Sequence, residues 1–128
     1  MKQPMTAKEL RDRLGNGEDA LGLSIEAWDR RAHWIRAGGN REKTNGSVST
    51  CGLCVEVNYA PGKYDICYNK CRYGKFYSEP CHHDDRSALN EFSNLLEDLL
   101  THNDVLACAA EEMRDRLIAI KKGAKHDE

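Results

Sequence analysis

Apolar side chains recur every three or four residues in four separate stretches of the chain, the spacing that gathers them on one side of an α-helix. The clearest stretch contains Leu89, Phe92 and Leu96, with Glu91 and Asn94 on the opposite side. The other three stretches repeat the same period. The pattern therefore predicts about four helices, at approximately 6–14, 24–37, 86–101 and 104–122.

Residues with capping chemistry mark where these helices begin. Thr6 and Glu9 have the spacing of a capping box, and Ser24 is the N-cap candidate of the second helix. The connection between the last two helices is short and polar, so we expect these helices to form an antiparallel hairpin. Cys108 lies within the last helix, and we expect it to be a small buried core residue.

A second period occurs between the helices. Residues 55–59 and 64–68 alternate apolar and polar side chains, and a Pro-Gly pair lies between them. Such alternation around a turn predicts a small β-hairpin, with Cys54 and Cys67 on the same face. The expected fold class is mostly α: a helical bundle that carries a small β-hairpin.

Composition and charge are typical of a soluble protein. The chain has 128 residues, of which 31% are charged and 40% hydrophobic, and its net charge is -2. This length fits one domain over residues 1–128, and the apolar runs are too short to span a membrane. We therefore expect no membrane association and a cytoplasmic location. The arginines between residues 30 and 41 are interpreted as a solvated face rather than as phosphate ligands.

Five of the six cysteines lie between residues 51 and 81. A reducing cytoplasm favours metal-bound thiolates over disulfides, and zinc takes four such ligands in a tetrahedron. We predict a structural zinc site in a zinc-knuckle-like insertion over 51–82, held by four of the following five residues: Cys51, Cys54, Cys67, Cys71 and Cys81. The choice between Cys71 and Cys81 stays open, and His82 and His83 are less favoured substitutes. An iron-sulfur cluster is the alternative cofactor, because it takes the same thiolates.

Aromatic and basic residues are interleaved in the second half of this insertion. Side chains of these types are common in protein contact surfaces and also stack on nucleic-acid bases. We predict a partner-binding surface formed by six residues: Tyr68, Arg72, Tyr73, Lys75, Phe76 and Tyr77. The alternative is that the aromatic rings only cover the metal site.

Two short motifs, L-S-I-E-A-W at 23–28 and C-G-L-C at 51–54, precede C-x3-C and a last cysteine after Pro80. In these motifs the chain resembles a loosely defined set of small Cys-rich proteins of bacteriophages and prokaryotes, over roughly residues 23–81. Those proteins have C-x2-C where this chain has Cys67-x3-Cys71, and a Gly-Thr-Pro after the last cysteine that this chain lacks. The resemblance implies an accessory protein of a phage or mobile element that acts in a bacterial cytoplasm.

These observations favour a non-enzymatic protein. A zinc ion held by four thiolates has no open position for water, and the adjacent His82, His83, Asp84 and Asp85 are interpreted as a loop and helix cap. We expect a metal-stabilised module that binds another protein, such as a host or defence factor, through either the tyrosine-rich segment or the acidic last third of the chain, residues 83–128. The alternatives are a zinc-stabilised nucleic-acid-binding protein and an iron-sulfur or thiol redox protein.

Overall fold

The computed structural model of the chain describes residues 3–44, 52–57, 64–79, 81, 88–98 and 100–123. Every regular element in these ranges is helical, which confirms that the protein is mostly α. The elements are α1 (Ala7–Gly15), α2 (Ala20–Arg36), the 3-10 helix η1 (Arg41–Thr44), α3 (Gly52–Glu56), α4 (Tyr64–Asn69), α5 (Arg72–Tyr77), α6 (Ala88–Glu97) and α7 (Asn103–Lys122). None of the described helices is long and apolar enough to cross a membrane.

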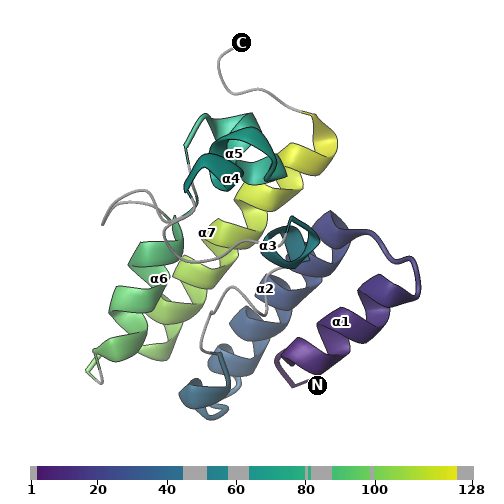
Figure 1. Cartoon of the computed structure of the whole chain (residues 1–128). Coiled ribbons are helices and arrows are strands. Elements are labelled where there is room, and N and C mark those ends of the chain that lie inside the picture. The colour runs from purple at the N-terminus through teal and green to yellow at the C-terminus, as the bar shows by residue number, and fades with distance from the viewer. Residues whose placement is uncertain are drawn as a thin grey trace.

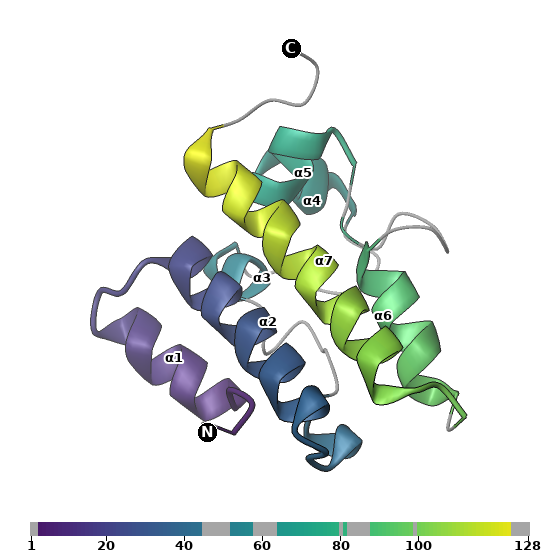
Figure 2. The ribbon, with the colours of Figure 1, turned by 180° about the vertical axis from the view of Figure 1, so that it is seen from behind.

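The two longest helices, α2 and α7, lie side by side at the centre of the molecule (Figures 1 and 2). They run in opposite directions and make the most extensive contact of any pair of helices. Helix α1 lies on the outer side of α2, and α6 lies on the outer side of α7. The short helices α4 and α5 cover the C-terminal half of α7, and α3 contacts α2.

The main core lies where α2, α6 and α7 meet. The rings of Trp28 and Phe92 pack edge to face with their centroids 5.1 Å apart, and Phe92 is fully buried. Leu106, Met113 and Leu117 of α7 belong to the same apolar cluster. Burial of these large side chains is the main source of stability in such a fold.

Helix α1 begins as its capping residues predict. The Thr6 hydroxyl accepts a hydrogen bond of 3.1 Å from the backbone N–H of Glu9, which confirms Thr6 as the N-cap. A second, smaller cluster contains Leu10 of α1 together with Leu23 and Ala27 of α2. The helix predicted at 6–14 is therefore confirmed and packs against α2.

The second helix begins earlier than predicted. Asp19 is its N-cap, with a side-chain oxygen 2.8 Å from the backbone N–H of Gly22. Ser24 lies inside α2 and is fully buried: its hydroxyl donates to the Ala20 carbonyl at 2.9 Å and accepts from the Leu53 N–H at 3.3 Å. Ser24 therefore positions α3 on α2 instead of beginning a helix.

The predicted β-hairpin is wrong, because the described residues on both of its sides are helical. Residues 52–56 form α3 and residues 64–69 form α4, while the turn expected at 60–63 lies outside the described residues. Two glycines favour the helical arrangement by allowing close approach of backbones. A Cβ at Gly52 would lie 2.5 Å from the Ala20 carbonyl oxygen, and a Cβ at Gly74 would overlap the Cys67 carbonyl oxygen.

The arginines of α2 and η1 do not form the solvated face that the sequence favoured. Arg31 is 3% exposed, with its guanidinium 4.3 Å from the centre of the Trp28 ring. Arg30 binds the carboxylate of Glu9 at 2.6 Å and so joins α1 to α2. These cations hold helices together within the chain.

The antiparallel pairing of α6 with α7 is confirmed (Figures 1 and 2). Helix α6 is shorter than predicted: it extends from Ala88 to Glu97, and residues 86, 87 and 99 lie outside the described residues. Helix α6 ends at Glu97, and α7 begins at Asn103. The short connection holds α6 along one side of the N-terminal half of α7.

Candidate functional site

The four described cysteines of the predicted zinc site are all buried. Cys54 lies on α3 and Cys67 on α4, while Cys71 and Cys81 flank α5 and belong to the main apolar cluster. Within the described part of the chain, no group of three or more His, Cys, Asp or Glu residues could hold a metal ion. The predicted zinc-binding centre is therefore wrong as far as these four cysteines are concerned.

The physical reason is the helical conformation of the segment. The prediction brought Cys54 and Cys67 together as neighbours across two paired strands. In the structure these residues lie on two separate short helices instead, so this pairing does not form. The remaining ligand candidates, Cys51, His82 and His83, lie outside the described residues. The iron-sulfur and thiol redox alternative uses the same cysteines, and no cluster of ligands in the described ranges favours it.

The six predicted partner-binding residues are divided between the surface and the interior. Tyr68, Arg72 and Lys75 are exposed, and Phe76 and Tyr77 are half-buried. Arg72 lies 3.4 Å from the carboxylate of Asp19. The contact role of the exposed residues stays a prediction.

Tyr73 is only 2% exposed, so its ring does not face a partner in this structure. The hydroxyl of Tyr77 donates to the carbonyl of Arg116 at 2.6 Å, and the guanidinium of Arg116 donates to the hydroxyl of Tyr73 at 3.3 Å. Burial raises the pKa of Tyr73 to about 12. Both tyrosines therefore join α5 to α7 and serve the fold.

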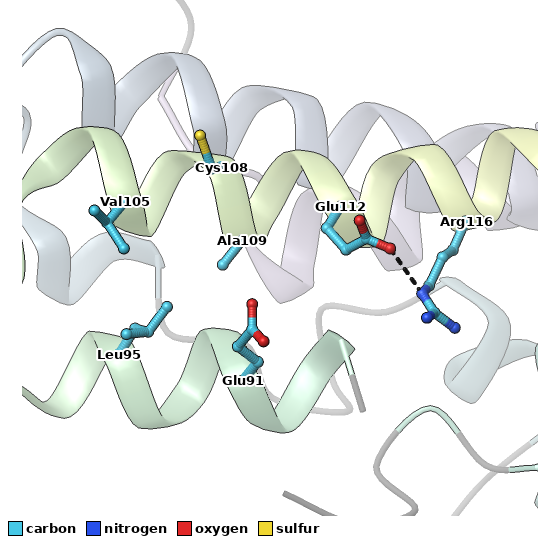
Figure 3. A pocket seen from close by; sticks show the side chains of 7 residues that line it. All are labelled: Glu91, Leu95, Val105, Cys108, Ala109, Glu112 and Arg116. Carbon is cyan, nitrogen blue, oxygen red and sulfur yellow. Dashed lines mark hydrogen bonds and ion pairs between the residues drawn. The ribbon is translucent and has the colours of Figure 1, made fainter. Parts of the chain in front are cut away.

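Cys108 is exposed, which corrects the prediction that it is a buried core residue. Its sulfur points away from α6 (Figure 3) and lies 3.4 Å from a guanidinium nitrogen of Arg36. Arg36 also binds Glu111 at 2.8 Å and Asp104 at 3.2 Å. The residue thus lies at the outer edge of the contact between α2 and α7.

A groove of about 380 Å³ lies between α6 and α7. Seven residues line it: Glu91, Leu95, Val105, Cys108, Ala109, Glu112 and Arg116 (Figure 3). Leu95 projects from α6 toward α7, and Val105 and Ala109 project from α7 toward α6, so these three form an apolar floor. Charged side chains lie along the rest of the groove.

The electrostatic character of this region is acidic. The Arg116 guanidinium is bonded to the carboxylate of Glu112 at 2.9 Å, whereas the structure records no ion pair of Glu91 among the described residues. Helix α6 contains no lysine or arginine, and three acidic residues lie on it or directly after it: Glu91, Glu97 and Asp98. The groove therefore combines an apolar floor with an excess of negative charge.

Large apolar side chains are exposed at the same end of the molecule. Val105 is 51% exposed at the start of α7, and Leu100, in the connection before it, is 91% exposed. Neighbouring exposed apolar residues beside a groove are typical of a contact surface. The seven residues that line the groove are called the α6–α7 surface below, and Leu100 lies beside it.

The sequence indicated the acidic last third of the chain as a possible contact region but did not identify the α6–α7 surface itself, although a signal was present. The apolar stripe of α6 is unusually broad, because Leu95 adds to Leu89, Phe92 and Leu96. A single neighbouring helix covers only part of such a stripe. Leu95 is half-buried and lines the groove, so α7 does not cover it completely.

Comparisons with protein-family models, with curated proteins and with solved structures give no match. The resemblance to Cys-rich phage proteins stays a prediction.

Proposed function

We propose that the chain is a non-enzymatic protein-binding module and that the α6–α7 surface is its contact site. The observation that supports the proposal most directly is the apolar floor of the groove, which α6 and α7 leave open. Removing such surface from water contributes roughly 25 cal/mol for each Å² that a partner covers. A partner that covers Val105 and Leu95 gains this free energy with little additional cost for ordering the backbone of the site, because both residues lie on formed helices.

The polar groups of the groove support binding rather than catalysis. Glu112 and Arg116 are engaged with each other at 2.9 Å, and Cys108 points away from α6. Glu91 is the remaining charged residue of the groove lining. General acid or base catalysis requires a side chain held within hydrogen-bond reach of a reacting atom, with its pKa near the working pH. An exposed carboxylate beside an apolar floor is better suited to orienting a partner.

Other parts of the sequence-based hypothesis rest on weaker support. The cytoplasmic location, and a host or defence factor as the partner, stay predictions. The α6–α7 surface does not favour a nucleic acid, because Glu91 in its lining and the exposed Glu97 and Asp98 beside it repel phosphates. The proposal therefore concerns a protein partner.

Site-specific photo-crosslinking tests the proposal. A photoreactive benzophenone amino acid replaces Val105 in one variant and the exposed Arg11 of α1 in the control, and both are illuminated in cells of the source organism. We expect one protein to be crosslinked from position 105 and not from position 11. Mass spectrometry identifies that protein, which is then purified for titration.

The titration uses two matched substitutions. Val105→Gln removes an apolar side chain from the groove, and Leu100→Gln removes one that does not line it. We expect Val105→Gln to weaken binding about tenfold, as for a residue at the centre of a contact, and Leu100→Gln to change it less than about twofold. Equal crosslinking from both positions, or full affinity of Val105→Gln, contradicts the proposal.

A further inference from the structure

The shape of the groove determines which kind of segment fits it. The α7 residues that line it extend from Val105 to Arg116 and so span roughly 16 Å along the helix axis, at 1.5 Å per residue. On α6, Glu91 and Leu95 are four residues apart and lie on one side of the helix. The groove is therefore a long seam between two antiparallel helices. A third helix fits such a seam, because its side chains pack into the space between two ridges.

Other backbone conformations fit less well. An extended segment binds a protein mainly by adding a strand to the edge of a sheet, and the described residues contain no sheet. A helix satisfies its own backbone hydrogen bonds, so that it needs only side-chain contacts from the groove. Val105, Ala109 and Leu95 offer such contacts.

The charge of the region determines the chemistry of that helix. Glu91 is exposed, and the structure shows no ion pair for it within the described residues. Glu97 is also exposed on α6, and the exposed Asp98 directly follows it. Lysine or arginine beside the apolar stripe of a partner helix would meet these carboxylates and favour the correct alignment.

A second copy of this chain does not meet that requirement. If α6 of one copy packed against α6 of another, the acidic residues of both helices would approach one another without any lysine or arginine on α6. Like charges that face each other disfavour such a contact. The acidic residues of α6 therefore favour a different, basic partner over self-association.

From these observations we infer that the segment that occupies the groove is an amphipathic, basic helix of another protein. Its apolar residues, spaced three or four apart, lie on Leu95, Val105 and Ala109, and its lysine or arginine residues lie beside Glu91. This inference rests on the proposed function and adds the chemical class of the partner.

Synthetic helical peptides test the inference. Three peptides of about 15 residues, roughly four helical turns, are titrated into the isotope-labelled protein, and backbone amide shifts are followed by NMR. The first has a leucine stripe flanked by lysines, the second has glutamates in place of the lysines, and the third has the composition of the first in scrambled order. We expect the lysine peptide to shift amides of α6 and of the N-terminal half of α7, and the other two to bind at least about tenfold more weakly.

A charge reversal sharpens the test. Glu91→Lys should lower the affinity for the lysine peptide about fivefold and raise the affinity for the glutamate peptide. This is expected when one exposed charge attraction becomes a repulsion. Asp65→Lys, an exposed substitution on α4 with the same change in charge, is the matched control and should alter neither affinity. Equal binding of both peptides, or equal effects of the two substitutions, overturns the inference.

The outcomes separate this inference from the proposed function. If the lysine peptide fails to shift the amides of α6 and α7 while a crosslinked protein still binds through Val105, the basic helix is wrong and the contact surface stands. If neither a peptide nor a crosslinked protein binds there, both fail.

Discussion

Helix α7 contacts α2 on one side and α6 on the other. The two contacts differ in how completely they pair charged side chains and bury apolar ones. On the α2 side, ion pairs join the helices at two levels: Arg36 binds Glu111 at 2.8 Å, and Asp29 binds Arg114 at 2.8 Å. Alanines such as Ala107 are fully buried in the shared core and permit close packing. The contact between α2 and α7 therefore pairs charged side chains and buries apolar ones.

On the α6 side, the contact is complete only near Phe92. Beyond this residue, Val105 remains 51% exposed and Leu95 is half-buried. No ion pair between α6 and α7 is recorded in the described residues. The difference teaches that the α2 side of α7 is built for stability, whereas part of the α6 side retains apolar surface that a partner can cover.

Phe92→Ala should have the largest effect, because it removes the one fully buried ring by which α6 reaches the core. We expect a loss of about 3–5 kcal/mol in the free energy of unfolding, from lost burial, the cavity and the contact with Trp28. Urea denaturation measures it. Leu95→Ala, three residues further along the same helix, is the control and should cost about 1 kcal/mol or less, because Leu95 is half-buried. Similar losses for both variants would remove the distinction between the closed and open parts of α6.

Acid should weaken the charged contacts that join α2 to α1 and to α7. Hydrogen bonds from Arg30 and Arg13 hold the pKa values of Glu9 and Glu26 below their ordinary value, and Arg36 does the same for Glu111. Lowered pKa values stabilise the fold above the ordinary carboxyl pKa of about 4.3, and this stabilisation is lost as the pH falls through the lower values of the folded state.

The variant Arg30→Met tests this dependence. It keeps the apolar stem of the arginine and removes the charge that joins α1 to α2 through Glu9. We expect a cost of about 1–2 kcal/mol near neutral pH, the range for hydrogen bonds to charged groups at partly exposed sites. The difference from the wild type should shrink as urea denaturation is repeated below about pH 4. A difference that is independent of pH would show that packing, and not charge, is lost.

The regular helices could be predicted from the sequence because their signals are local. Thr6 and Glu9 form a cap within four residues, and the apolar period of α7 is sustained over its whole length. In α2 the stronger cap, Asp19, lies before the apolar period that was used to place the start. Ser24 has the side chain of a cap, but its hydroxyl serves α3 instead.

The segment around the cysteines could not be predicted in this way. Alternation over five residues is too short to separate a strand from a short buried helix. What decides the outcome is tertiary: Gly52 lies against the backbone of α2, and Gly74 against that of α4. The predicted zinc ligands depended on the hairpin, so the error in secondary structure became an error in the site.

The α6–α7 surface could be predicted only in part. The excess of acid in the last third of the chain and the broad stripe of α6 are visible in the sequence. Which apolar residues remain open depends on how α6 lies along α7, a relation that the sequence does not state. The same applies to Arg31, whose position over Trp28 follows from the packing of α2 in the core.

Val105→Gln should have the smallest effect on stability. Val105 lies in the first turn of α7 and is half exposed, so the fold loses little buried area, and glutamine has an adequate helix propensity. We expect the free energy of unfolding to change by less than about 0.5 kcal/mol, as for most surface substitutions. Leu100→Gln, at an even more exposed position, provides the reference. If Val105→Gln instead costs about 2 kcal/mol or more, a range typical of core truncations, then Val105 contributes to the fold as Phe92 does, and the open side of α7 is not available to a partner.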